Sequence, residues 1–281
     1  MKKKTISNIL IHVILAVMVV IWVLPIVWVV LISFREEQGA YTTTFLPQGY
    51  TLDNYIRLFT ETDLFNFPLW FGNTFIVAVF SCLIATFYTL AVSYSMSRMR
   101  FKMRKPFMNI ALILGMFPGF MSMIAVYYIL KGVGLTEGPL KLVSLVLVYS
   151  GGAGLGFYVA KGFFDTIPKA IDEAACIDGC TRWQIFTKIT MPLSRPIIVQ
   201  TVLGAFMAPW VDFIFAKVIT GAEPQYYTVA IGLWNMLTRE NINQYYTRFA
   251  AGAVIVSIPI AILFMKMQKC YMQSNAGAVK G

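Results

Sequence analysis

The chain has 281 residues, of which 58% are hydrophobic and only 13% are charged. A soluble domain carries about a quarter charged residues, so this composition excludes a soluble enzyme and indicates an integral membrane protein. The formal net charge of +10 leaves nucleic acid and anionic lipid open as partners until the positions of the charges are considered.

Six apolar segments reach or approach the length of about 20 residues that a helix needs to cross the hydrocarbon core. The first follows Met-Lys-Lys-Lys but is 24 residues long and has no small-x-small cleavage site after it, so we expect a retained span rather than a signal peptide. The sequence predicts an all-α membrane protein, with one transmembrane domain over residues 1–281 and a six-span bundle over 9–267. The predicted spans are Ile9–Ile32, Trp70–Met96, Phe107–Leu130, Leu140–Phe164, Ile197–Ile219 and Ala250–Met267.

Lys and Arg are distributed unevenly between the connecting segments. With the N-terminus inside, 16 of the 23 Lys and Arg residues lie on inside segments. The positive-inside rule then predicts that both termini are cytoplasmic. This distribution explains the net charge without nucleic acid. Three of the four cysteines fall on segments assigned to the cytoplasm and Cys82 falls in a span, so no disulfide is expected.

Two predicted external loops are long. In the loop 33–69, the stretch Thr51–Phe59 has a helical pattern, so we expect partial order. In the loop 221–249, Tyr226–Leu237 has apolar residues at near-helical spacing. This second stretch is interpreted as an interfacial helix, a cap over a pathway or an aromatic anchor at the membrane surface.

Asp212 is a carboxylate inside the fifth predicted span. Its burial in a bilayer costs at least ~2.5 kcal/mol, so it should face a cavity, a polar partner or a substrate. With Trp210 and Phe213 it forms a candidate substrate path. The alternative is a structural pair with Lys217, whose long side chain can snorkel toward it.

Other features inside the spans favour structural roles. Gly151–Gly156 follows no predicted strand, so its glycines indicate close helix packing rather than a dinucleotide loop. His12 is expected to have a packing role. The prolines predict kinks or irregular points: Pro25, Pro118, Pro209 and Pro259. The sequence has no P-loop, no catalytic constellation and no metal-ligand cluster, so we expect no cofactor or metal on this chain.

The polar segment 165–196 interrupts the apolar pattern and predicts a helix–Gly–helix unit. Pro168 suits a first helical position, and Gly179 can end the helix with a positive φ. Thr181-x-x-Gln184 has the form of a capping box that starts a second helix, which Pro192 and Pro196 are expected to stop. From the residues alone, the unit is either a docking surface or an amphipathic hairpin resting on the membrane.

The pattern Glu173-Ala-Ala-x-x-Asp178-Gly179, followed by Phe186 and Met191-Pro-Leu-x-x-Pro196, resembles the EAA loop of ABC-importer permeases. Cys180 stands where a small residue is usual. The likeness extends over most of the chain. Tyr227-Thr-Val-Ala-Ile-Gly-Leu and the closing Gly277-Ala-Val-Lys-Gly281 are similar to the second permease subunit of maltose/maltodextrin importers.

The resemblance implies the type I importer permease fold, with six transmembrane helices in a prokaryotic cytoplasmic membrane, and no enzymatic activity on this chain. It implies a second, related permease subunit, two ATPase subunits that bind ATP and Mg²⁺, and an extracytoplasmic solute-binding protein that delivers a sugar or oligosaccharide, with maltodextrin as one candidate. The remaining alternatives are a permease for another solute and an ion-gradient-driven transporter, although the sequence has no convincing inverted repeat.

The resemblance also assigns roles to two sets of residues. The EAA loop would form a coupling helix in a groove of the ATPase. The cytoplasmic tail 268–281 would reach between the ATPase subunits. The implied coupling residues are Glu173, Ala174, Ala175, Asp178 and Gly179, and the implied tail contacts are Gly277, Ala278, Val279, Lys280 and Gly281.

Overall fold

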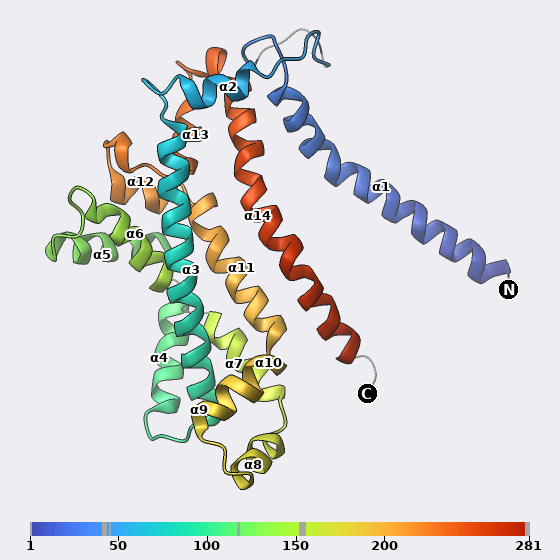
Figure 1. Cartoon of the computed structure of the whole chain (residues 1–281), viewed down its shortest axis with the longest axis vertical. Helices are drawn as coiled ribbons and strands as arrows, with labels where there is room; N and C mark the ends of the chain where they lie inside the picture. The colour runs from blue at the N-terminus through green and yellow to red at the C-terminus, as the bar shows by residue number, and fades with distance from the viewer. Residues whose placement is uncertain (1, 41–43, 45, 117–118, 152–155, 279–281) are drawn as a thin grey trace. The chain divides into compact units, whose positions relative to one another are not determined.

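The computed structural model describes residues 2–40, 44, 46–116, 119–151 and 156–278. These residues are mostly helical, and their only β-type pairing is an isolated antiparallel bridge between Arg35 and Tyr50 (Figure 1). The helices are α1 (Lys2–Ser33), α2 (Asp53–Thr60), α3 (Phe67–Arg98), α4 (Arg104–Met116), α5 (Gly119–Gly132), α6 (Leu140–Gly151), α7 (Gly156–Thr166), α8 (Lys169–Ile177), α9 (Arg182–Gln184), the π-helix η2 (Ile185–Thr190), α10 (Met191–Leu193), α11 (Arg195–Val211), α12 (Ile214–Thr220), the 3-10 helix η3 (Pro224–Tyr226), α13 (Val229–Met236) and α14 (Ile242–Ala278).

Four stretches are long and apolar enough to cross a membrane: Asn8–Ser33, Phe67–Arg98, Leu140–Thr166, which includes the undescribed residues 152–155, and Ile242–Gln268. The number becomes six if each of two bent helix pairs is one span. One pair joins α4 to Met121–Gly132 with a bend of 106°, and the other joins Arg182–Leu193 to α11 with a bend of 83°. If α4 and Met121–Gly132 form one span, the third predicted span is bent in the region where its proline predicts an irregular point. Pro118, expected to kink it, lies outside the described residues.

The fifth predicted span is not one continuous helix, which corrects the sequence-based expectation. α11 ends at Val211 and α12 begins at Ile214. Asp212 between them is extended, with ψ 119°, and its carboxylate accepts a hydrogen bond from the Phe215 N–H at 3.3 Å. A carboxylate beside a helix N-terminus satisfies an N–H that has no partner within the helix. The polar side chain thus serves as a cap in the gap between the two helices.

The chain divides into two compact units. The first comprises Met1–Pro68 with Gly232–Ile258, and the second comprises Leu69–Ile231 with Pro259–Gly281. In the first unit, the buried Asn54 of α2 joins three segments. Its Nδ2 donates to the carbonyls of Ser33 at 3.1 Å and Arg35 at 2.7 Å, and its Oδ1 accepts from Thr247 of α14 at 2.9 Å. The helix predicted in the loop 33–69 is confirmed as α2.

The second unit is tied together at one end by hydrogen bonds from the first turns of α3. Trp70 and Asn73 donate side-chain hydrogen bonds of 2.8 to 3.1 Å to carbonyls of the segment 224–227. Thr74 accepts one from the Val229 N–H at 2.8 Å. These side chains hold the segment that leads into α13, whose helix the sequence predicts within the loop 221–249.

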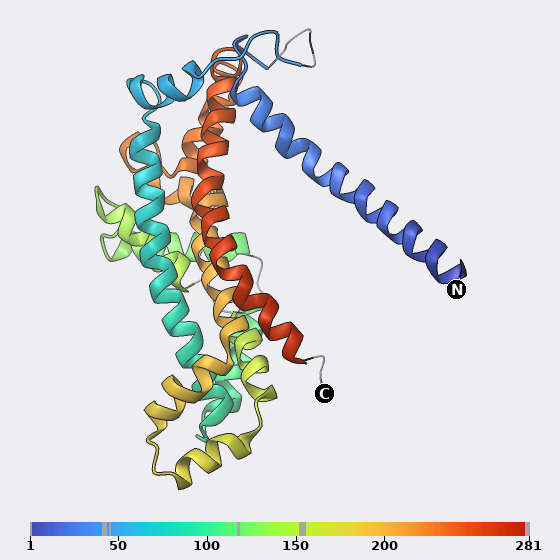
Figure 2. The same cartoon turned by 45° about the vertical axis from the view of Figure 1, so that its right-hand side comes forward.

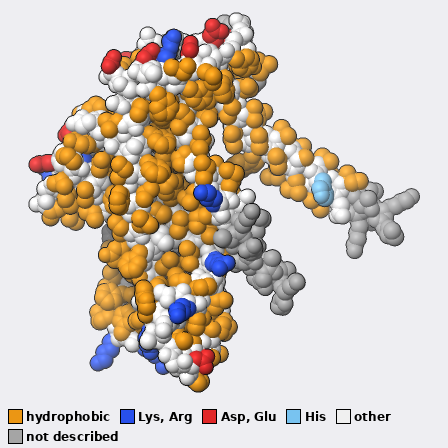
Figure 3. Space-filling model, viewed as in Figure 1, with side chains coloured by type: hydrophobic (Ala, Val, Ile, Leu, Met, Phe, Trp, Pro, Cys, Tyr) orange, Lys and Arg blue, Asp and Glu red, His pale blue; other side chains and the backbone are white. Residues whose placement is uncertain are grey.

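The other end of the second unit carries α8, α9, η2 and α10, and α8 lies beyond the last turns of α3 in both views (Figure 1, Figure 2). Apolar side chains cover much of the unit between its ends. Lys and Arg side chains gather toward the end with α8 and α9 (Figure 3). This is the distribution expected of helices that pass through hydrocarbon and emerge into a polar layer.

Candidate functional site

The segment 165–196 folds as the helix–Gly–helix unit that its sequence predicts. α8 ends in a Schellman motif, in which the Cys180 N–H bonds to the Ala175 carbonyl at 2.9 Å and the Gly179 N–H bonds to the Cys176 carbonyl at 3.1 Å. Gly179 has φ +80°, which a residue with a Cβ rarely adopts. Pro168 is the N-cap of α8 rather than its first residue.

The second helix begins with the predicted capping box. Thr181 Oγ1 accepts from the Gln184 N–H at 3.3 Å, and Gln184 Oε1 accepts from the Thr181 N–H at 2.8 Å. The prediction that Pro192 stops this helix is wrong, because the helix continues through η2 and α10 and breaks at Ser194. Pro196 lies in the first turn of α11, where a missing N–H leaves no helical bond unmade. Pro192 lies near the end of the continuous arm from Arg182 to Leu193.

Arg98, the last residue of α3, anchors the loop to the bundle. Its side chain is only 4% exposed. Its Nη2 donates to the Ile167 carbonyl at 2.8 Å, and its Nε lies 3.1 Å from Asp172 Oδ2 on α8. The residue before it, Ser97, donates from its Oγ to Asp165 Oδ1 at 2.6 Å. A single guanidinium therefore contacts both the entrance of the loop and its first helix.

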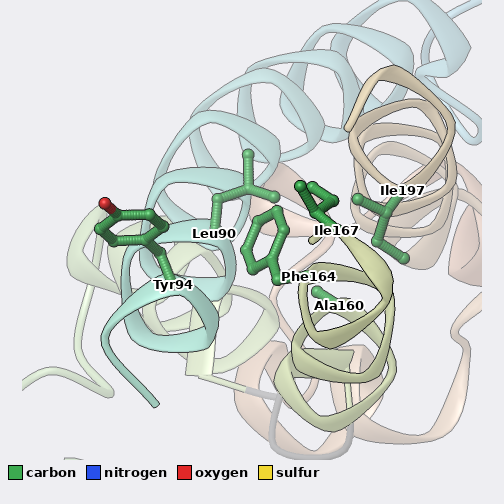
Figure 4. Close-up of a cluster of buried hydrophobic side chains, with 6 residues drawn as sticks. All are labelled: Leu90, Tyr94, Ala160, Phe164, Ile167 and Ile197. Atoms are coloured by element: carbon green, nitrogen blue, oxygen red, sulfur yellow. The ribbon is translucent and has the colours of Figure 1, made fainter. Parts of the chain in front are cut away.

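An apolar cluster supports this anchor from inside the second unit. Tyr94 of α3 packs on Phe186 of η2, with ring centroids 4.7 Å apart. Phe186 and Met191, both from the second half of the loop, pack against the buried core. The buried members come from α3, α7, α11 and the loop, and Figure 4 shows their side chains together: Leu90, Tyr94, Ala160, Phe164, Ile167 and Ile197.

The outer surface of the loop carries most of the residues that the EAA resemblance singles out. Glu173, Ala174, Asp178 and Gly179 are exposed, whereas Ala175 is buried at 6% exposure. Two large apolar side chains also project from this otherwise polar surface, with Ile177 87% and Trp183 65% exposed. Exposed apolar side chains beside polar ones are typical of protein or membrane contact surfaces.

A cavity of about 460 Å³ lies within the second unit, between α3, α6, α7, α11 and α12. Asp212 lines it and accepts a hydrogen bond of 2.8 Å from the hydroxyl of Tyr149 on α6. Lys217 does not pair with Asp212, because its Nζ donates to the Tyr227 hydroxyl at 2.7 Å. The polar lining residues are Thr89, Tyr149, Gln200, Thr201 and Asp212.

The three candidate path residues have different environments. Of the three, only Asp212 lines the cavity. Trp210 is buried at 3% exposure and packs against Phe71 and Phe206, with ring centroids 5.3 and 5.9 Å away. Phe213 lies beside Asp212 in the break between α11 and α12. The structure therefore brings Asp212 to a cavity and gives Trp210 a packing environment.

The predicted tail contacts lie at the end of α14. Gly277 and Ala278 are its last helical residues, and Val279, Lys280 and Gly281 lie outside the described residues. Residues 152–155 of the glycine-rich Gly151–Gly156 stretch are also outside them. Among the described residues, no group of three or more His, Cys, Asp and Glu could hold a metal ion.

Sequence reasoning missed two residues that organise these sites. Arg98 counted only as one positive charge, although it ends a span just before a cluster of basic residues. Tyr149 lies in an apolar run, where its hydroxyl was the available signal for a buried polar partner. In each case the partner lies more than sixty residues away in the chain, so no local pattern reveals the pairing.

Known proteins share both this sequence and this fold. The profile of the family described as "Binding-protein-dependent transport system inner membrane component" matches residues 89–271. The galactooligosaccharides transport system permease protein GanQ of Bacillus subtilis (strain 168) is 33% identical over 272 residues, which cover 96% of this chain and 94% of GanQ. The maltodextrin transport system permease protein MdxG of the same organism is 33% identical over 250 residues, covering 89% of this chain and 87% of MdxG.

The fold matches that of a solved transporter. A crystal structure of a bacterial ABC transporter involved in the import of the acidic polysaccharide alginate contains a chain with a TM-score of 0.77 and 21% identity, covering 96% of this chain and 98% of that chain. The predicted permease fold is thereby confirmed, and the chain is a non-catalytic transport component of a bacterial inner membrane. It belongs to the family of inner membrane components of binding-protein-dependent transport systems.

Proposed function

We propose that this chain is a permease subunit of an ATP-driven importer of neutral sugars or oligosaccharides. In this proposal the cavity beside Asp212 borders the sugar path, and the loop 165–196 faces the cytoplasm and docks on a separate ATPase. The relatives named for galactooligosaccharide and maltodextrin transport support a sugar as the substrate class. Maltodextrin itself is one candidate within that class.

The observation that carries the proposal is the exposed but firmly held loop. Glu173, Asp178 and the apolar Ile177 project from it, while Arg98 fixes its base to the end of α3. A surface that is rigid and partly apolar can transmit a push from a docked partner, because packed interiors have low compressibility. We infer that ATP-driven closure of the partner moves α3 and α11 through this contact.

The cavity favours a neutral sugar over an acidic one. Its lining includes one carboxylate, that of Asp212, and no Lys or Arg. A uronate would meet like charge there, whereas sugar hydroxyls can donate to Asp212 and exchange hydrogen bonds with Gln200 and Thr201. Gly204, Ala205 and Ala208 on α11 also line the cavity. Because they have no side chain or only a methyl group, they leave room for a sugar ring.

The other subunits in this proposal are inferred from the missing P-loop and from the family description. The sequence contains no P-loop, so a separate ATPase must supply ATP binding. The family description names a binding protein, which we propose delivers the sugar from outside. A second, related permease would complete the pathway. The tail from Gly277 to Gly281 is proposed as a further ATPase contact.

The coupling role is tested with Glu173→Gln in reconstituted vesicles, with sugar uptake and ATP hydrolysis measured together. A charge-assisted hydrogen bond contributes about 1.5–3 kcal/mol, so its loss should weaken docking by about tenfold or more. Uptake should fall relative to ATP hydrolysis while insertion into the membrane is unchanged. The matched control is Glu137→Gln, an exposed carboxylate outside the loop. Normal coupling in the Glu173 variant would refute the proposed contact.

A further inference from the structure

A basic pocket of about 410 Å³ lies where α3 meets the loop 165–196. Arg98, Met99 and Arg100 line it from the end of α3, and Arg182 lines it from the first turn of α9. The pocket therefore bridges a membrane-spanning helix and the second helix of the loop. Its lining residues are different from those of the cavity beside Asp212, and Glu173 is not one of them.

The pocket has more positive charge than the described residues neutralise. The Asp172 carboxylate faces the Nε of Arg98, and the Ile167 carbonyl accepts from its Nη2. Its Nη1 is buried without a hydrogen-bond partner. Arg100 and Arg182 are exposed, and no ion pair joins either of them to another described residue. Three arginines therefore line one pocket, and one of them has a buried donor without a hydrogen-bond partner, which an anion could satisfy.

The surroundings of the pocket indicate which anion it binds. α3 is a candidate span that ends at Arg98, and we take the pocket beyond this end to lie near the headgroups of the bilayer. Met99, Phe101 and Met103 follow in the chain and are 36%, 40% and 51% exposed, and Trp183 beside Arg182 is 65% exposed. Exposed apolar and aromatic side chains next to basic ones are typical of the membrane interface rather than of an aqueous surface.

We propose that this pocket binds the phosphate of an anionic phospholipid headgroup, with Arg98, Arg100 and Arg182 as donors and Met99 and Phe101 against the acyl region. Guanidinium groups suit this ligand because their planar forks match phosphate oxygens. The bound lipid links the end of α3 to α9. Lipid composition would then influence how firmly the loop is held, whether or not the loop docks on an ATPase.

The test on the unaltered protein uses the full chain, purified with the subunits that accompany it. Native mass spectrometry counts bound phosphatidylglycerol and phosphatidylcholine, and thermal unfolding is compared in nanodiscs of phosphatidylcholine with and without phosphatidylglycerol. We expect retained phosphatidylglycerol and a rise in Tm that high salt diminishes. Equal retention of the two lipids and equal Tm values would overturn the proposal.

Variants locate the site. Arg100→Gln and Arg182→Gln should each weaken phosphatidylglycerol binding by about fivefold, and the pair by more. Arg195→Gln is the matched control, because Arg195 is exposed at the start of α11 and does not line the pocket. Arg182→Lys keeps the positive charge, so it should weaken phosphatidylglycerol binding less than Arg182→Gln does.

Three outcomes would exclude a phospholipid site at this pocket. The first is an equal loss of binding in the Arg195 control, which would indicate general attraction to the bilayer. The second is saturation of the Tm rise by glycerol phosphate alone, which would indicate a soluble phosphate ligand. The third is unchanged lipid binding in the double variant together with loss of a copurifying subunit, which would assign the arginines to a protein carboxylate.

Discussion

At the scale of single residues, the bond between Tyr149 and Asp212 determines how the second unit tolerates a carboxylate among apolar helices. Among the described residues, the Tyr149 hydroxyl and the backbone N–H of Phe215 donate hydrogen bonds to that side chain. Hydrogen bonds to charged groups contribute about 1.5–3 kcal/mol. We expect Tyr149→Phe to lower the free energy of unfolding by about this amount, measured as a loss of Tm in the purified protein.

The same pair predicts a specific coupling between substitutions. Asp212→Asn should cost less than Tyr149→Phe, because a neutral amide is less costly than an unpaired charge in apolar surroundings. In the Asp212→Asn background, Tyr149→Phe should then have a much smaller effect. Tyr128→Phe is the control, since Tyr128 is 66% exposed and its ring packs on that of Tyr127. Additive effects of the two substitutions would show that the bond is not important for stability.

Asp212 and Tyr149 differ in how much of their environment can be predicted from the sequence. A carboxylate in an apolar run is conspicuous, and the physical cost of burying it predicts a polar environment without any structure. Its partner Tyr149 gives no such signal, because tyrosines are common in membrane helices near the membrane–water interface. Lys217 was the nearer candidate in sequence but bonds to Tyr227 instead. Whether Asp212 contacts sugar stays a prediction.

At the scale of elements, Gly179 determines where α8 ends and how the loop turns into α9. Its φ of +80° costs a residue with a Cβ about 1–2 kcal/mol. Gly179→Ala should therefore destabilise the loop by this amount, seen as faster hydrogen exchange over 165–196, and should lower sugar uptake per ATP hydrolysed.

Gly162 provides a control in which the same substitution, Gly to Ala, should raise stability instead of lowering it. It lies within α7, its φ is not positive, and an added Cβ would meet nothing within 4 Å. Gly162→Ala should stabilise that helix by up to about 1 kcal/mol. Equal hydrogen exchange in the Gly179→Ala and unaltered proteins would contradict the role assigned to the left-handed turn.

Arg98 makes a second prediction at this scale. Removing one partner of a buried ion pair costs about 3–5 kcal/mol, and the lower end applies here because Asp172 is 19% exposed. Arg98→Lys keeps the charge but cannot reach both the Ile167 carbonyl and Asp172 with the same geometry. We expect faster hydrogen exchange and easier proteolysis within 165–196, with Arg195→Lys as the control. Undisturbed protection of the loop would show that the apolar cluster alone holds it.

The loop also separates what is predictable in an element from what is not. The turn at Gly179 and the capping box at Thr181 depend on neighbours within a few residues, so the sequence pattern reveals them. The π-helical stretch from Ile185 to Thr190 does not follow from any local pattern. It accompanies the packing of Phe186 and Met191 on the core, which depends on residues far away in the chain.

At the scale of the whole molecule, the apolar segments predict the number of spans better than their shapes. Length and hydropathy define six segments. The structure has four stretches long and apolar enough to cross a membrane, and six if two bent helix pairs each count as one span. The second bent pair, 182–211, begins well before the fifth predicted span, Ile197–Ile219. The size of the 106° bend between α4 and α5 does not follow from composition, because both arms are apolar, and the sequence indicates only an irregular point at Pro118. The order α1 to α14 then follows the fold of a known importer permease.

The orientation of this fold in the membrane depends on charge counting and is tested through a native thiol. Cys176 is exposed on α8, whereas Cys82 is buried in α3. If the loop 165–196 is cytoplasmic, a membrane-impermeant maleimide should label Cys176 in inverted vesicles and not in intact cells. Mass spectrometry of peptides from the purified chain identifies the labelled cysteine, and Cys176→Ser gives the background.

The same thiol connects orientation to docking. Cys176 lies between Glu173 and Asp178 on the proposed contact surface, so a bound ATPase should slow its labelling, and separating the ATPase should restore the rate. The maleimide must react with the thiolate, so the comparison is made at one pH, with a free thiol peptide as the reference. Labelling from outside intact cells would reverse the assigned orientation and, with it, the coupling role of the loop. Labelling from inside at a rate that the ATPase does not change would keep the orientation and refute the docking surface.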